Sequence, residues 1–433
     1  MTTQVRRTVP FSGDPIATAA ALAAGARDQH VVYEQPGEVW FAEGAQASVV
    51  VSGGTAALRL GHGRRQDFAA GPALFDGVRS ALGALPATDW RVFGWVSFEH
   101  VHRPTEDTTA HLIVPRRQIR FAGDTAVLTA VDDAEMNRLH DRLERAITDA
   151  AAPPSGDRVT VSPDGDEAEL YRKAVAEAID TIRSGALDKV ILSRIVPVPG
   201  EIDLPATYLA GRRGNDPARS FLLDLGGWAA AGFSPEIVAR VTAHGTVVTQ
   251  PLAGTRALAG DPRLDLARRG ELYRDTKEVF EHAISVHLAA TEMATVCAPG
   301  TVHVQDFMSV KERGSVQHLA SEVSGRLADG ATAWDTLSVL FPAITASGVP
   351  KRAACDLIRQ TEPNRGLYSG AVLTAAADGT LDAALVLRSV FRHAGRTWLR
   401  AGAGVVAKSD PARELEETRE KLLSVSRFLV PAR

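Results

Sequence analysis

The sequence has few of the features that mark secreted or membrane-spanning proteins. It contains only two cysteines, Cys297 and Cys355, with neither metal-ligand spacing nor a pairing pattern. They indicate small buried side chains in a reducing compartment, so we expect a cytoplasmic protein. No run approaches the roughly 20 apolar residues that cross a membrane. The alanine-rich stretch after Asp14 and Pro15 is only weakly apolar, and these two residues favour a capped helix over a signal peptide.

The sequence also lacks a basic surface pattern. Its formal net charge is -4, and no cluster of Lys and Arg with interleaved aromatic residues is present. Nucleic acid is therefore not an expected partner. What the chain does have is a composition typical of a globular protein with a large core, because 45% of its 433 residues are hydrophobic and 23% are charged.

The pattern of turns and apolar runs predicts an α+β protein. Residues 1–155 mix long strand-like runs with helical segments near 70–84 and 133–150, and the stretch 151–157 is a candidate surface linker. Residues 156–433 continue with more strands and late helices, including a long helix from about Leu272 to Thr295. We predict large, mostly antiparallel sheets packed together with helices outside, and a single body in which both parts share sheets.

Two pairs of glutamates at helical spacing are the strongest chemical signal. Glu278 and Glu281 share one helix face, as do Glu414 and Glu417, with Lys421 one turn further on. Such faces repel themselves unless a cation lies between them, and the glycine-rich strand WLRAGAGVV nearby can offer backbone amides to an anion. The pattern indicates a divalent metal that helps to hold an anionic small molecule. Alternatively, both are solvated helices with ordinary surface ion pairs.

Two further residues have the chemistry of an acid and base pair. Lys189 opens the apolar strand KVILSRIV, and desolvation lowers the pKa of an amine so that it can act as a base. Glu236 lies between a Gly/Ser/Pro turn and a β-branched strand, where a dry site would keep a carboxyl protonated as a general acid. Alternatively, Lys189 is exposed at the first position of its strand and Glu236 is an exposed strand glutamate.

Four more residues are candidates for ligand contact. Gly254 and Thr255 follow a strand, where the backbone can approach a ligand and a hydroxyl can bond it, or where threonine simply stabilises a turn. His318 in a strand-like run contacts substrate or is a satisfied core histidine. Arg388 ends an apolar strand, so its burial would require an anionic partner such as a substrate carboxylate.

A set of segments in a fixed order resembles the chorismate-utilising enzymes, the family of anthranilate synthase large subunits, isochorismate synthases and salicylate synthases. The segments are DKVILSR, GFSPE, PLAGTRA, KEVFEHAISV, FPAITASGVPK, RGLYSGAV, DAALVLRS, WLRAGAGVV and RELEETREK. Within the family the chain looks most like the salicylate-forming branch, and the likeness extends into the first part through FGWVSFE.

The resemblance implies a role for each matching residue. Lys189 would activate water for attack at C2 of chorismate, and Glu236 would protonate the departing C4 hydroxyl. Glu281 and Glu417 would bind Mg²⁺ most directly, with Glu278 and Glu414 nearby and acting through water. The enolpyruvyl carboxylate would be held by Arg388, Tyr368, Lys421, Gly402, Ala403 and Gly404. The ring pocket would be lined by Gly254, Thr255, Thr345 and His318, and the last would also serve in catalysis.

The implied reaction converts chorismate to isochorismate and then to salicylate and pyruvate. An isochorismate synthase that releases its intermediate, an anthranilate-type enzyme and a non-catalytic chorismate-binding protein are the alternatives. Lys189 argues against the ammonia-using members, which generally lack a lysine there, and we expect no amidotransferase subunit and a monomer. Gln250 stands where the resemblance implies glutamate, which leaves open whether isochorismate is released or carried on.

Overall fold

The chain is described by a computed structural model over residues 4–61, 63–102, 104–150 and 157–432. The predicted linker 151–157 lies outside the described residues except for Asp157. Within the described residues, no helix is long and apolar enough to cross a membrane.

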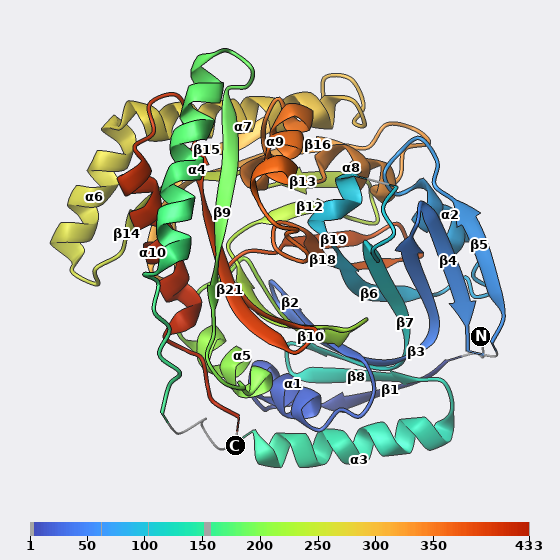
Figure 1. The fold of residues 1–433 in the computed structure, drawn as a ribbon. Coiled ribbons are helices and arrows are strands. Elements are labelled where there is room, and N and C mark those ends of the chain that lie inside the picture. Colours follow the sequence, from blue (N-terminus) through green and yellow to red (C-terminus); the bar gives the residue numbers. More distant parts are fainter. Residues whose placement is uncertain (1–3, 62, 103, 151–156, 433) are drawn as a thin grey trace.

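The strands are antiparallel throughout and belong to one highly curved sheet (Figure 1). Their bounds are β1 Val5–Pro10, β2 His30–Gln35, β3 Glu38–Ser52, β4 Thr55–Leu60, β5 Arg65–Ala69, β6 Arg91–Val96, β7 Ala110–Ala122, β8 Thr125–Ala130, β9 Lys189–Pro197, β10 Arg219–Leu225, β11 Trp228–Ser234, β12 Ile237–Val241, β13 Thr246–Thr249, β14 Leu252–Ala257, β15 His303–Arg313, β16 Val316–Arg326, β17 Gly348–Val349, β18 Ala371–Ala376, β19 Leu381–Leu385, β20 Ser389–His393 and β21 Arg396–Val405.

The helices lie outside this sheet. Their bounds are α1 Pro15–Ala24, α2 Asp76–Gly83, α3 Asp133–Asp149, α4 Asp166–Arg183, α5 Leu204–Arg213, α6 Pro262–Arg274, α7 Thr276–Ala294, α8 Ala333–Leu340, α9 Lys351–Thr361 and α10 Pro411–Ser426, with short 3₁₀ turns η1 Phe98–His102 and η2 Ile344–Ala346. The predicted fold class, an α+β single body with mostly antiparallel sheets and outer helices, is confirmed.

Strand pairing joins the two halves of the chain. One continuous path runs β17–β9–β21–β20–β11–β10–β2–β3–β7–β6–β18–β19–β12–β13–β16–β15. The path therefore crosses between early and late strands at β10–β2 and again at β6–β18. Because the early strands lie in the middle of this path, they join the part that contains β9 and β21 to the part that contains β16, on which β14 also pairs, in one body.

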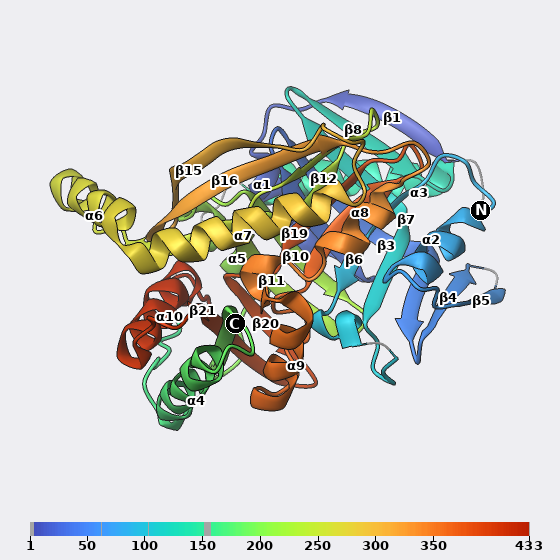
Figure 2. The same cartoon turned by 90° about the horizontal axis from the view of Figure 1, so that it is seen from above.

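Helices of the second half flank the region where these two ends approach each other. α10 and α4 pack beside β9 and β21, and α7 packs on β14 and β16. Figure 2 shows α7 lying between the long β15–β16 ribbon and the α10 and α9 side, with α6 projecting beyond the end of α7. The two glutamate-bearing helices are thereby brought to one place.

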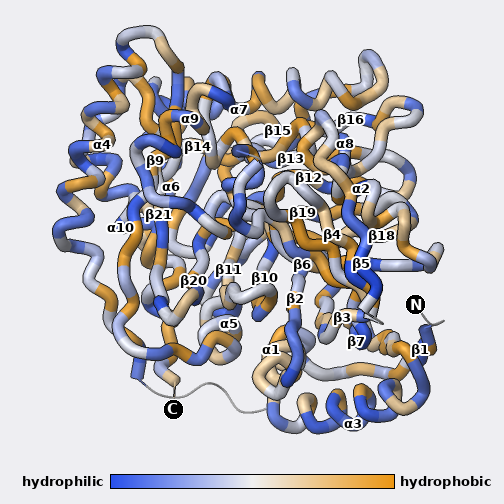
Figure 3. The backbone as a smooth tube through the Cα atoms, turned by 45° about the vertical axis from the view of Figure 1, so that its right-hand side comes forward, coloured by the Kyte–Doolittle hydropathy of each residue, from blue (hydrophilic) through white to orange (hydrophobic). Residues whose placement is uncertain are grey.

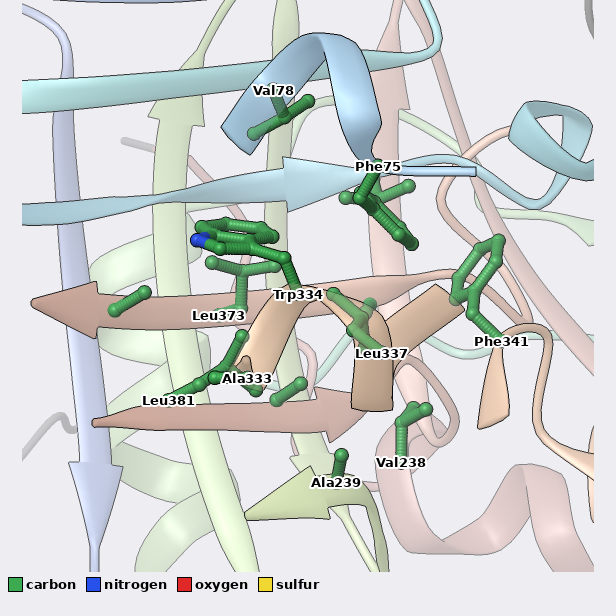
Figure 4. Close-up of a cluster of buried hydrophobic side chains, with 14 of the residues drawn as sticks. Phe75, Val78, Val238, Ala239, Ala333, Trp334, Leu337, Phe341, Leu373 and Leu381 are labelled. Carbon is green, nitrogen blue, oxygen red and sulfur yellow. The ribbon is translucent and has the colours of Figure 1, made fainter. Parts of the chain in front are cut away.

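The core explains why the strands are so apolar. Figure 4 shows one cluster in which Trp334 and Leu337 of α8 pack between Phe75, Phe341 and Leu373. In Figure 3 the apolar stretches concentrate around β18 and β19, whereas the edge strand β5 is largely hydrophilic. Burial of these side chains contributes about 25 cal/mol for each Å² of apolar surface removed from water.

Two predicted elements differ in their bounds. The long helix predicted from about Leu272 begins instead at Thr276, because the Asp275 carboxylate caps it by accepting from the amides of Lys277 and Glu278. A separate helix, α6, precedes it. The helix predicted from Asp14 is confirmed, with the Asp14 carboxylate accepting from two amides of the first turn.

Candidate active site

A cavity lies between β21, α10 and the strands β14 and β16. It is lined by most of the residues predicted from sequence, which come from many separate elements: Glu236, Gly254, Thr255, Glu281, His318, Thr345, Tyr368, Arg388, Gly402, Ala403, Gly404, Glu417 and Lys421. The other three predicted residues, Lys189, Glu278 and Glu414, are buried just behind this lining.

Glycine is needed on β21 because other groups approach its backbone closely. A Cβ at Gly404 would lie 2.0 Å from Oε1 of Glu281, and one at Gly402 would lie 2.5 Å from the carbonyl oxygen of Leu192. Gly404 therefore lets the Glu281 carboxylate reach this strand, and Gly402 lets the carbonyl of Leu192 on the paired strand approach it.

Glu236 is a buried carboxyl in the gap between β11 and β12. Its Oε1 accepts from the Thr345 hydroxyl at 2.7 Å and its Oε2 from the Leu252 amide at 2.8 Å. Burial raises the pKa of Glu236 to about 7, although these two hydrogen bonds and the charges of Lys189 and Arg388 oppose the rise. The interpretation of Glu236 as an exposed strand residue is wrong, because only 2% of it is accessible.

Lys189 is fully buried, so the interpretation of it as an exposed strand terminus is also wrong. The short strand β17 pairs with the start of β9 and covers it. The Lys189 ammonium lies 3.0 Å from Oε1 of Glu281 and donates to the Ser285 hydroxyl at 2.9 Å. Two partners, of which Glu281 lines the cavity, thus fix this nitrogen just behind the lining.

The two glutamate pairs meet in space, around Lys277, as the resemblance implied. All four carboxylates are at most 5% exposed. Lys421 lies 2.7 Å from Glu417, and its charge lowers the pKa of Glu417 against the opposing effect of burial. Burial raises the pKa of Glu414, by contrast. The alternative that these are solvated surface helices is wrong.

A lysine that sequence reasoning missed lies among these carboxylates. The Lys277 ammonium is 3.5 Å from Glu278, 3.3 Å from Glu281 and 3.2 Å from Glu414. Burial alone would lower the pKa of Lys277, but Glu281 and Glu414 raise it well above its ordinary value. In the part of the chain that the structure describes, no three acidic, His or Cys side chains are grouped closely enough to be ligands of one ion as they stand.

The donor set nevertheless fits a hard divalent cation. Four carboxylates supply only oxygen ligands, which Mg²⁺ prefers. Two of those oxygens, Oε2 of Glu414 and Oε2 of Glu417, are buried without a hydrogen-bond partner. Buried orphan carboxylate oxygens are costly, and a metal ion would satisfy them.

His318 and Arg388 form a second polar pair in the cavity. Arg388 donates to Nε2 of His318 and, at 2.7 Å, to the carbonyl of Arg313. A guanidinium has only donors, so Nε2 is the acceptor and the ring proton sits on Nδ1, which faces the oxygens of Thr255 and Gly254. Burial and the charge of Arg388 lower the pKa of His318 well below its usual value, so the imidazole is neutral.

Arg388 itself has a positive charge with no anionic partner. Among the described residues, no carboxylate lies within ion-pairing distance of its guanidinium, although the side chain is buried and lines the cavity. Burial lowers the pKa of Arg388 to about 9, with Arg313 acting in the same direction. An anion in the cavity is what this group lacks, as its sequence position predicted.

Comparison with known proteins agrees with this geometry. A family model described as chorismate binding enzyme matches residues 28–427. The chain belongs to the chorismate binding enzyme family. A salicylate synthase of Mycolicibacterium paratuberculosis is 42% identical, with 98% of this chain and 95% of that protein aligned. Anthranilate synthase component 1 of Halobacterium salinarum is 35% identical over 82% of this chain and 74% of that protein.

Solved structures share the fold of this family member. The menaquinone-specific isochorismate synthase of Escherichia coli superposes with a TM-score of 0.74 at 21% identity, covering 99% of this chain and 95% of that one. A 2,3-dihydroxybenzoate-specific isochorismate synthase from Bacillus anthracis gives 0.72 at 23% identity, covering 95% and 98%.

In this chorismate binding enzyme, a network that sequence reasoning missed supports the wall of the cavity. The carboxylate of Glu362 accepts from Arg365 at 2.9 Å, from Arg400 at 2.7 Å and from the Ser193 hydroxyl at 2.7 Å. Both guanidinium groups also lie over the ring of Tyr368, at 5.8 and 5.5 Å from its centre. The sequence carried no signal for this network, because Glu362 and Arg365 lie in the polar run RQTEPNR and their pairing with Arg400 depends on the fold.

Replacing Glu362 with alanine should destabilise the protein strongly. The variant leaves Arg365 and Arg400 buried without their shared counter-ion, which typically costs about 3–5 kcal/mol. Urea unfolding measures the change, with Glu169→Ala as the control, because Glu169 makes an exposed pair with Arg172 that contributes about 0–1 kcal/mol. Equal effects of the two substitutions would contradict a structural role for the Glu362 network.

Proposed function

We propose that this chain is a salicylate synthase that converts chorismate to isochorismate and then to salicylate and pyruvate. The observation that carries the proposal is a buried glutamate with a raised pKa in the wall of one cavity and a fully buried lysine just behind that wall, next to four converging carboxylates. The salicylate synthase that aligns with 98% of this chain supports the same reaction.

In the first step, Lys189 acts as the general base and Glu236 as the general acid. This step uses Lys189 in its deprotonated form, whose amine takes a proton from water as the water oxygen bonds to C2 of the ring. The ring double bonds shift, and the C4 hydroxyl leaves as water with the proton of Glu236. The Thr345 hydroxyl, which donates to Glu236 in the structure, can rotate to accept from the carboxyl when that is protonated.

Substrate is held by polar and charged side chains that line the cavity. Arg388, steadied by its bond to neutral His318, receives the enolpyruvyl carboxylate together with Tyr368 and Lys421. Glu281 and Glu417 would hold Mg²⁺, with Glu278 and Glu414 in support, and the ion would supply positive charge for the ring carboxylate of chorismate. Gly254, Thr255 and Thr345 line the ring pocket.

The second step needs confinement rather than a further catalytic group. The hydrogen at C2 of isochorismate moves to the methylene carbon of the side chain as the C3–O bond breaks, which gives an aromatic ring and pyruvate. The cavity holds the side chain over the ring and so favours this internal transfer. We further infer a cytoplasmic monomer that needs no amidotransferase subunit, because its nucleophile is water and Cys297 and Cys355 are both buried free thiols.

Product identification tests the proposal. Purified protein incubated with chorismate and Mg²⁺ should yield fluorescent salicylate and an equal amount of pyruvate without any added lyase, and chelation of the metal should stop both. Accumulation of isochorismate alone would show instead that the protein is an isochorismate synthase that releases this intermediate. Binding of chorismate without any turnover would contradict an enzymatic function.

A further inference from the structure

Three lysines neutralise the carboxylates at this site, and they are held in different ways. Lys189 and Lys421 each combine one close carboxylate with a hydrogen bond to an uncharged group, namely the Ser285 hydroxyl and the Gly402 carbonyl, both at 2.9 Å. Each is therefore held in place even if its carboxylate changes partner.

Lys277 is held only by charge. Its ammonium contacts three carboxylates at 3.2–3.5 Å, and none of the hydrogen bonds among the described residues comes from this nitrogen. The side chain is 13% exposed, compared with 0% for Lys189, and it belongs to the first turn of α7. An ammonium at the end of a helix, with a flexible stem and an edge open to water, can leave without breaking a directed bond.

Glu414 depends on this ammonium more than the other carboxylates do. Glu281 is also paired with Lys189, Glu278 with Arg256, and Glu417 with Lys421. Among the described residues, Lys277 is the one ion-pair partner of Glu414, whose other oxygen has no hydrogen-bond partner. The three carboxylates around Lys277 are all members of the proposed metal site. A metal ion therefore cannot bind there while the Lys277 ammonium remains among them.

We propose that Lys277 is an internal substitute for the divalent metal, so that metal binding is an exchange of cations. In metal-free protein its ammonium keeps the carboxylates apart yet neutralised; when the ion binds Glu281 and Glu417, with Glu278 and Glu414 in support, the Lys277 side chain turns out toward water. This inference rests on the proposed metal site. The exchange lets the site stay folded without metal, at the expense of metal affinity.

Metal binding without chorismate tests the exchange. Calorimetric titration of chelator-treated protein with Mg²⁺ should show binding that is about tenfold tighter in Lys277→Met than in wild type, because no paired ammonium has to leave. Lys351→Met is the matched control: Lys351 is 16% exposed and pairs with Glu292 elsewhere on α7, so its loss should leave Mg²⁺ affinity unchanged. Unchanged or weaker binding in folded Lys277→Met would overturn the proposal.

A measurement on wild-type protein covers the case in which the variant does not fold. Acetylation of amines, read by mass spectrometry, should label Lys277 severalfold faster with Mg²⁺ than with chelator, whereas the exposed Lys173 and the buried Lys189 should keep their rates. Unchanged labelling of Lys277 under conditions in which Mg²⁺ binds would refute the exchange. Salicylate formation is assayed separately, so failure of the cation exchange and failure of the proposed reaction can be told apart.

Discussion

Lys189→Met is expected to lower kcat with chorismate by about 10²–10⁴-fold, the usual contribution of a positioned general base. The amine is the proposed acceptor of the proton from water, and methionine fills a similar volume without a lone pair of comparable basicity. The fold should survive, because Glu281 keeps an ion pair with Lys277 at 3.3 Å after the substitution.

Two further variants separate the base from a merely electrostatic role. Lys189→Arg keeps a positive charge near Glu281 but cannot lose its proton, so it should be as inactive as the methionine variant. Ser285→Ala removes the hydroxyl that Lys189 contacts but keeps the amine, and should cost far less activity. Turnover of Lys189→Arg close to that of wild type would refute the assignment of Lys189 as the base.

Glu236→Gln should have the second largest effect on kcat. It should lower activity, yet raise the free energy of unfolding relative to wild type at pH 8. Loss of the general acid should lower kcat by about 10²–10⁴-fold. The amide can preserve both contacts, since its oxygen accepts from the Leu252 amide and its nitrogen donates to the Thr345 hydroxyl. The variant should therefore fold normally and lack only the transferable proton.

The stability of the same variant should depend on pH. The pKa of Glu236 is about 7 in the folded protein and about 4.5 in an unfolded chain, so the folded state binds this proton more tightly. This proton adds up to about 3 kcal/mol to the free energy of unfolding. The contribution is complete below pH ~4.5 and is lost as the pH rises through about 7. Urea unfolding should show Glu236→Gln gaining stability over wild type from pH 5 to pH 8. A constant difference across this range would contradict the raised pKa.

The sequence could predict the features that depend on local spacing. Glutamates three residues apart must share a helix face, and Asp14 before Pro15 must cap a helix, so both held in the structure. The turn before Glu236 and the glycines of β21 likewise marked places where the backbone is interrupted or closely approached. The overall class followed from long strands joined by turns, with several of the helices late in the chain.

Other features depend on contacts between distant segments and left no local signal. Burial of Lys189 comes from β17, which lies about 160 residues later in the chain, as the pairing of Val349 with Lys189 shows. The position of Lys277 among three carboxylates depends on α10 approaching α7. Pairing of Glu362 with Arg400 likewise needs the β9–β21 ladder. Sequence periodicity cannot identify which charged residues pair across distant segments, because each is one of many charged residues in the chain.

Isotope tracing tests most directly the central claim that water attacks C2 of chorismate in this cavity. With chorismate in water enriched in ¹⁸O, the proposed reaction places one solvent oxygen in the phenolic hydroxyl of each salicylate, because that oxygen enters in the step assigned to Lys189. Mass spectrometry of salicylate and its fragments should therefore find a single ¹⁸O at that hydroxyl. Salicylate that carries only ¹⁶O there would contradict the account.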